Sequence, residues 1–152
     1  MELKQIADAF LSIESMSPKK LQKLCYYAYS WDIVVNDVEG NDRIIDSKVK
    51  FEAWVHGPVN RNLYSIYKDY GYNKIPKIED MPNHVESNPN AKELVMQVFR
   101  LYGHMSGDAL ELLTHDEQPW IEAREGLNDY ESSNKELSEK TILNFYKKKL
   151  EA

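Results

Sequence analysis

Four histidines provide the side chains of this sequence that titrate closest to neutral pH. No two of them have the spacing of an HExxH helix or of another local metal-ligand pattern. The run His115-Asp116-Glu117 places three metal-capable groups in a row, but adjacent residues rarely all point at one ion, and no second motif completes a ligand set. We therefore predict no metal site, and we expect Thr114, His115 and Asp116 to satisfy exposed backbone groups at helix ends.

His56 is the histidine whose position most invites a catalytic interpretation, because it comes just before a sharp Gly57-Pro58 turn. An imidazole at such a corner can act as a general base if an acid lies across a cleft. However, the sequence contains no GxSxG motif, partnered cysteine–histidine signature, GxGxxG motif or P-loop. We predict a hydrogen-bonding turn histidine, with no catalytic residue and no cofactor. A cryptic hydrolase remains an alternative, and it requires His56, His115 and Asp116 to converge on one pocket.

The composition is that of a globular protein. The chain has 152 residues, of which 42% are hydrophobic and 29% charged, enough for a compact core, and we expect a single domain over residues 1–152. No apolar run reaches the roughly 18 residues of a membrane-spanning helix. The start, MELKQIADAFLSIES, also lacks the basic beginning and apolar stretch of a signal peptide. We therefore expect a cytoplasmic protein with no membrane partner.

The single cysteine, Cys25, excludes an intramolecular disulfide and any cysteine-rich metal site. It falls among the apolar positions of a predicted helix. Free cysteine at such a position is most often buried, so we predict an inert thiol.

Charge is distributed unevenly along the chain. The formal net charge is −6 overall, but it is +1 over residues 1–77 and −10 over residues 78–139. The acidic stretch argues against a nucleic-acid partner, because binding a phosphate backbone needs clustered Lys and Arg. It would suit a basic protein surface, although a solvated acidic face that aids solubility explains it equally simply.

Hydrophobic periodicity predicts about six helices, of which one is central. Residues 18–35 begin with Ser17 as an N-cap and Pro18 in the first turn. This segment is apolar over most of its circumference, with a narrow polar face formed by Lys23 and Ser30. Because a helix that is apolar nearly all round must be covered on several sides, we predict that the other helices pack around it.

A short β-hairpin is predicted near residues 43–55. Residues 36–48 are rich in turn formers, and the apolar residues from 49 to 55 alternate with period two. Gly57-Pro58 should then break the chain and start the next helix. The last helix is expected to include Leu137. The predicted fold class is therefore mainly α, a helical domain with a small hairpin.

Three segments carry a resemblance to a known family. Residues 18–35 read PKKLQKLCYYAYSWDIVV and are similar to the pattern lqKLlYya…w. Residues 51–71 read FEAWVHGPVNRNLYSIYKDYG, similar to feAw.hGPV…lY..yk.yg, and residues 112–126 read LLTHDEQPWIEAREG, similar to lTH…PW..ar.g. These patterns, in this order, are those of the Panacea-domain or SocA-like family. The sequence particularly resembles its phage-associated members.

The resemblance implies a cytoplasmic antitoxin that neutralises a cognate protein toxin by direct binding. The genes of such proteins often lie beside the toxin gene or in prophages, and no enzymatic activity is generally assigned to the domain. One branch of the family acts as a proteolysis adaptor that delivers its toxin to a protease. An adaptor role, with a protease as a second partner, is therefore an alternative for this chain.

The sequence has ten tyrosines and three tryptophans, residue types that are favoured at interfaces but also at the edges of cores. A motif shared by antitoxins against different toxins is expected to maintain the fold, so the choice of toxin is expected to lie in less patterned surface. The sequence indicates no oligomeric state. The candidate partner-binding residues are the aromatic, basic and polar side chains of the second and third segments, namely Trp54, His56, Arg61, Tyr64, Tyr67, His115, Asp116 and Trp120.

Overall fold

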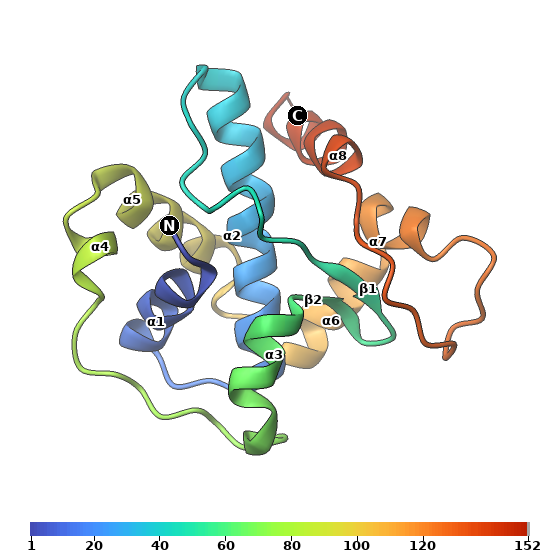
Figure 1. Ribbon diagram of the computed structural model, residues 1–152, viewed down its shortest axis with the longest axis horizontal. Helices are drawn as coiled ribbons and strands as arrows, with labels where there is room; N and C mark the ends of the chain where they lie inside the picture. The colour runs from blue at the N-terminus through green and yellow to red at the C-terminus, as the bar shows by residue number, and fades with distance from the viewer. Residues whose placement is uncertain (152) are drawn as a thin grey trace.

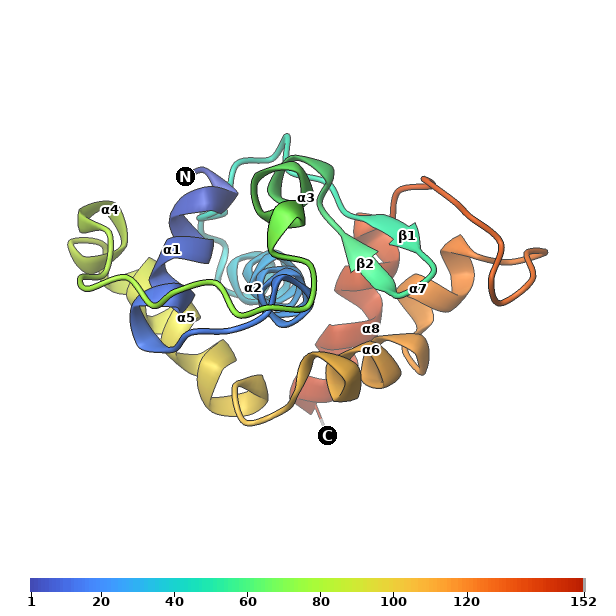
Figure 2. The same ribbon diagram turned by 90° about the horizontal axis from the view of Figure 1, so that it is seen from below.

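A long central helix organises the fold. The computed structural model describes residues 1–151 and contains, within that range, eight α-helices, six of them with seven or more residues, and one β-hairpin (Figure 1). Helix α2 (Pro18–Glu39) contacts α1, α3, α5, α6, α8 and strand β2. Figure 2 looks along α2 and shows these elements arranged around it. The predicted mainly helical fold around a buried central helix is confirmed.

Local signals fix both ends of α2. The Ser17 hydroxyl accepts a hydrogen bond from a backbone N–H of the first turn, and Pro18 occupies the first position. The helix runs four residues past its predicted end because no helix breaker occurs before Gly40, which adopts φ +72°. Even its predicted polar face is covered, since Lys23 and Ser30 are both buried. The surrounding chain therefore encloses α2 along most of its length and leaves its last residues, 37–39, exposed.

Two groups of helices flank α2 on opposite sides (Figure 1). The first group consists of α1 (Leu3–Ile13), α4 (Asn83–Glu86) and α5 (Pro89–Tyr102). The second consists of α6 (Gly107–His115), α7 (Gln118–Ala123) and α8 (Glu139–Glu151). No helix among residues 1–151 is long and apolar enough to cross a membrane.

The predicted short β-hairpin is confirmed, and it lies at residues 52–59, further along the chain than the predicted range near 43–55. Strands β1 (Glu52–Trp54) and β2 (Gly57–Val59) pair antiparallel and are joined by a two-residue turn that contains His56. A segment near residue 136 runs beside β1, where the Ala53 N–H donates to the Lys135 carbonyl at 2.8 Å and the Leu137 N–H donates to the Phe51 carbonyl at 2.9 Å. Leu137 thus precedes the last helix, contrary to its predicted place within it.

Contacts between segments that are distant in the sequence explain why residues 43–45 do not form the first strand of the hairpin. The backbone N–H groups of Ile44 and Ile45 donate to the buried Asp32 carboxylate of α2 at 2.9 and 2.8 Å, so residues 43–45 are not paired as a strand. Gly57-Pro58 opens β2 and not a helix. Helix α3 (Arg61–Tyr67) begins after Asn60, whose side chain accepts the N-capping hydrogen bond, and continues as a 3-10 turn (Lys68–Tyr70).

The core combines aliphatic side chains with a buried polar cluster. The hydroxyls of Tyr27 and Tyr146 donate to the same Glu117 carboxylate oxygen at 2.8 and 2.7 Å, and the Tyr26 and Tyr146 hydroxyls are 3.1 Å apart. Burial raises the pKa of Glu117 above its ordinary value, against the two tyrosine hydrogen bonds. Cys25 is buried as predicted, and burial raises the pKa of its thiol. Tyr26 and Tyr27 of α2 therefore belong to the core.

Candidate partner-binding site

The three sequence segments meet at one place, which we call the hairpin junction and define by Lys23, Gly57, Pro58 and Thr114. The Lys23 ammonium reaches from α2 and donates to the Pro58 carbonyl at 3.2 Å. Gly57 has φ +107°, and a Cβ atom there would lie 2.5 Å from Lys23 Cε and 3.0 Å from Thr114 Oγ1. Only glycine fits this position, for reasons of both backbone conformation and space. The motif glycine thus allows α2, β2 and α6 to approach closely.

Lys23 is unusual because its charged group lies inside the protein. Its exposed fraction is 1%. Burial lowers the pKa of Lys23 to about 7, and the attraction of Glu111 only partly opposes this effect. The amino group of Lys23 serves the hairpin junction as a hydrogen-bond donor whether or not it is protonated.

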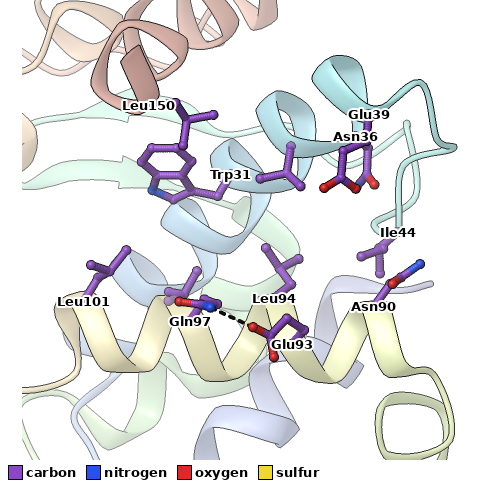
Figure 3. A pocket seen from close by; sticks show the side chains of 12 residues that line it. Trp31, Asn36, Glu39, Ile44, Asn90, Glu93, Leu94, Gln97, Leu101 and Leu150 are labelled. Carbon is purple, nitrogen blue, oxygen red and sulfur yellow. Dashed lines mark hydrogen bonds between the residues drawn. The ribbon is translucent and has the colours of Figure 1, made fainter. Parts of the chain in front are cut away.

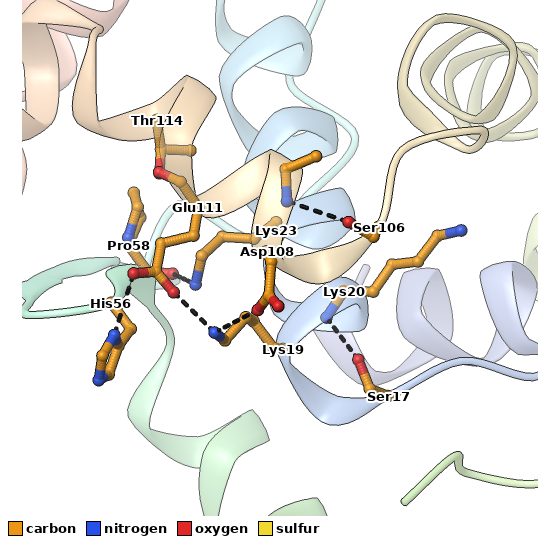
Figure 4. A network of polar contacts seen from close by, with 11 residues as sticks. Ser17, Lys19, Lys20, Lys23, His56, Pro58, Ser106, Asp108, Glu111 and Thr114 are labelled. Atoms are coloured by element: carbon orange, nitrogen blue, oxygen red, sulfur yellow. Dashed lines mark hydrogen bonds and ion pairs between the residues drawn. The ribbon is translucent and has the colours of Figure 1, made fainter. Parts of the chain in front are cut away.

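Glu111 on α6 connects the hairpin junction to the surface (Figure 4). One carboxylate oxygen accepts from Lys19 Nζ at 2.7 Å, and the other lies 3.0 Å from His56 Nδ1. Burial would raise the pKa of the Glu111 carboxyl, but hydrogen bonds from Lys19 and His56 hold that pKa below its ordinary value. An ionised Glu111 thus fixes the imidazole at the tip of the hairpin.

Side chains of the third segment support the hairpin from behind. The Trp120 indole donates to the Trp54 carbonyl at 2.9 Å, and the Arg124 guanidinium donates to the Ala53 carbonyl at 2.8 Å. The His115 ring stacks on Trp120 with 3.9 Å between centroids and 16° between planes. Burial lowers the pKa of His115, against the attraction of Glu111, so its ring is uncharged at neutral pH.

Three side chains around the hairpin project into solvent, and we call them the hairpin surface: His56, Arg61 and Tyr64. Their exposed fractions are 68%, 59% and 43%. Arg61 forms two hydrogen bonds with the Glu52 carboxylate, and the Tyr64 ring meets the Trp54 ring edge-on, 4.9 Å between centroids. Each exposed group is thus held by a partner within the chain.

Two clefts adjoin this surface. One has a volume of about 400 Å³ and is lined by Trp54, His56, Tyr64 and Tyr67 together with residues of α2. The other has a volume of about 490 Å³ and lies between the hairpin, Arg61 and the loop at residues 132–134. His56 and Trp54 line both clefts, so the tip of the hairpin forms a ridge between two hollows.

Comparison with known proteins identifies the family. The family model for the antitoxin SocA-like, Panacea domain matches residues 21–121. The chain belongs to this family. No curated protein and no solved structure is significantly similar to it. The matched range contains the hairpin junction, so in this Panacea domain the three resembling segments of the sequence form one packed structural unit.

The structure brings together most of the candidate residues of this Panacea domain. Trp54, His56, Arg61, Tyr64 and Tyr67 lie around the hairpin and its two clefts. The rings of His115 and Trp120 stack behind the hairpin. Asp116 is exposed and is the C-cap of α6.

Sequence reasoning missed Lys23, Glu111 and Glu117 as organising residues. The sequence assigns Lys23 only to the narrow polar face of the central helix, although its place in the first Panacea segment is a signal of importance. The sequence gives no signal for the roles of Glu111 and Glu117, because their hydrogen-bond partners are distant. The partners of Glu111 lie 55 and 92 residues away, and those of Glu117 lie 29 and 90 residues away.

The alternative of a hydrolase finds little geometric support. Among residues 1–151 neither the His56 nor the His115 imidazole hydrogen-bonds to a serine, threonine or cysteine. His56 is engaged by Glu111, and His115 stacks on Trp120. Within the same range no group of three His, Cys, Asp or Glu side chains is arranged to hold a metal ion.

Proposed function

We propose that this Panacea protein is an antitoxin that neutralises a cognate protein toxin by direct, non-enzymatic binding, and that it is encoded beside that toxin in a toxin–antitoxin or prophage locus. Membership of the SocA-like antitoxin family is the observation that carries this proposal. We further propose that the hairpin surface contacts the toxin.

The chemistry of the hairpin surface supports a binding role. Tyr, Trp and Arg are the residue types that contribute most to protein interfaces, and here Tyr64 and Arg61 project beside the Trp54 ring. Hydrogen bonds and ring contacts already restrict their rotamers. Because ordered side chains lose less conformational entropy on association, such a surface favours tight binding.

Burial divides the remaining candidate residues into contact and support roles. Tyr67 is 8% exposed, so we propose that it supports α3 and does not itself touch the toxin. The stacked rings of His115 and Trp120 hold the hairpin through the Trp54 carbonyl. Trp54 is half-buried and can contribute its ring edge between the two clefts.

Co-expression with the product of the adjacent gene tests this proposal. We expect the neighbouring protein to stop growth when produced alone, and growth to return when the wild-type chain is produced with it. The triple variant His56→Ala/Arg61→Ala/Tyr64→Ala should fail to restore growth although it folds.

The matched control for the triple variant replaces one exposed residue of each type that lines neither cleft, Arg100→Ala/His104→Ala/Tyr130→Ala. This control should restore growth like the wild type. A neighbouring product that is not toxic, or toxicity that the wild-type chain does not relieve, would refute the proposed function. Equal rescue by the triple variant would refute only the assignment to the hairpin surface.

A further inference from the structure

An apolar groove lies on the opposite half of α2 from the hairpin junction. It has a volume of about 360 Å³ and runs between the C-terminal part of α2, helix α5 and the end of α8 (Figure 3). We call it the α2–α5 groove. Trp31 and Leu94 form part of its floor, while Leu101 and Leu150 are 55% and 51% exposed at its edge. Figure 3 shows these apolar side chains turned toward the groove.

The groove is preformed. The Trp31 indole donates to the Tyr102 hydroxyl at 2.9 Å, which fixes the ring in the groove wall. Water in the groove lies against mainly apolar walls. Displacing that water with apolar side chains is favourable. The groove is therefore ready to receive apolar side chains of a partner.

Among residues 1–151 the only charged residues that line the groove are two acids, Glu39 and Glu93. Within residues 1–151 neither carboxylate forms an ion pair with a lysine, arginine or histidine. Their hydrogen bonds come from neutral amides, from Asn41 to Glu39 and from Gln97 to Glu93. An apolar floor with unpaired acids at the rim is complementary to apolar anchors flanked by basic side chains.

The walls of the groove indicate the shape of its occupant. They are helices, so no free strand edge is offered for strand addition, and the mode that fits is an amphipathic helix laid in a groove. A second copy of this chain fits poorly, because each copy carries a net charge of −6. With the exception of Trp31 and Val35, the lining residues lie outside the three segments that form the hairpin junction.

We propose that the α2–α5 groove binds an amphipathic helix of the toxin that has apolar residues at i, i+3 or i+4, and i+7 and has Lys or Arg beside them. This inference rests on the proposed function and extends it by naming a second contact surface and the chemistry it recognises. The two surfaces lie at opposite ends of α2, so each can be changed without altering the other.

The test compares two groove variants with matched controls. The charge variant Glu39→Lys/Glu93→Lys is matched by Glu79→Lys/Glu125→Lys, and the apolar variant Leu101→Arg by Leu112→Arg. All of the replaced side chains are exposed, so the variants should unfold within about 2 °C of the wild type. The probe is the purified product of the adjacent gene, with its affinity measured by calorimetry at low and high salt.

We expect each groove variant to weaken binding at least tenfold and each control to change it less than threefold. The affinity of the wild type should fall more steeply with salt than that of Glu39→Lys/Glu93→Lys, because salt screens the complementary charges. Hydrogen exchange in the complex should protect a basic amphipathic helix of the toxin.

Each other outcome overturns the inference in a distinguishable way. Wild-type binding that the groove variants retain would overturn the groove assignment and leave the proposed function standing. A chain that does not bind the neighbouring product at all would remove both. Self-association in sedimentation that Leu101→Arg abolishes would show that a second copy occupies the groove. Protection of an acidic or extended toxin segment would also contradict the proposed occupant.

Discussion

The hairpin junction and the α2–α5 groove lie on the two halves of the same helix but are built in opposite ways. At the hairpin junction, α2 is covered by a glycine-dependent backbone contact and by buried polar side chains that all have partners within the chain. At the groove, α2 is left partly uncovered, with exposed leucines and unpaired acids. Most residues that carry the family resemblance thus have hydrogen-bond or packing partners within the chain. The groove, in contrast, has exposed side chains that can contact another molecule.

This difference teaches how to interpret the motif. A buried side chain whose hydrogen bonds are all made inside the chain contributes little to partner choice, and changing it should affect stability first. An exposed side chain should affect binding first, even where a neighbouring residue holds it in place. The following predictions test the contrast, beginning with the largest effect on stability.

Gly57→Ala should be the most damaging single change at the hairpin junction. The new methyl group would overlap the enclosed Lys23 side chain at a positive φ, and we expect a loss of about 3 kcal/mol in the free energy of unfolding. Denaturant titration measures this loss. The control is Gly126→Ala, also at positive φ but with no atom within 4 Å of the new Cβ, which should cost only about 1 kcal/mol. Equal losses would show that the close approach is unimportant.

Lys23 should make stability depend on pH. Its pKa is about 7 when folded and about 10.5 when exposed, so the unfolded state binds more protons between these values and stability rises with pH through this window. Between pH 7 and pH 9 the wild type should gain about 2 kcal/mol relative to Lys23→Met. The control Lys74→Met, at an exposed position, should follow the wild-type pH profile. A parallel profile for Lys23→Met would contradict the burial of an ionisable amine.

Tyr146→Phe should weaken the buried cluster beside the hairpin junction. It removes the hydroxyl that donates to Glu117 at 2.7 Å and lies 3.1 Å from the Tyr26 hydroxyl. We expect a loss of about 1.5 kcal/mol in thermal or chemical unfolding. Tyr64→Phe, which changes an exposed tyrosine, should cost less than about 0.5 kcal/mol. If the two substitutions cost the same, the cluster does not contribute to stability as proposed.

The parts of the fold that follow from local pattern could be predicted, and those that follow from distant contacts could not. The periodicity of residues 18–35 and the Ser17 cap were sufficient to place the central helix. The predicted range of the hairpin begins too early in the chain for two reasons. The Asp32 carboxylate engages residues 44 and 45, and the backbone near Leu137 pairs beside Phe51. Neither partner is visible in a local window.

Part of the candidate site could likewise be predicted from the sequence, and part of it could not. The aromatic and histidine residues of the second segment pointed to the hairpin, and the structure gathers them there. The role of Glu111 in fixing His56 depends on a contact across 55 residues. The groove depends on how far apart α2 and α5 are held, so no spacing of apolar residues along the sequence indicates it.

The most direct test measures two quantities on one set of variants, the dissociation constant for the adjacent gene's product and the free energy of unfolding. The set consists of the wild type, Gly57→Ala, Tyr146→Phe, the hairpin-surface triple variant and Glu39→Lys/Glu93→Lys. We predict two separate groups. The junction and core variants should lose stability, and they should bind normally once folded. The two surface variants should bind at least tenfold more weakly with wild-type stability. A single trend in which affinity falls only as stability falls would contradict the division between scaffold and binding surface.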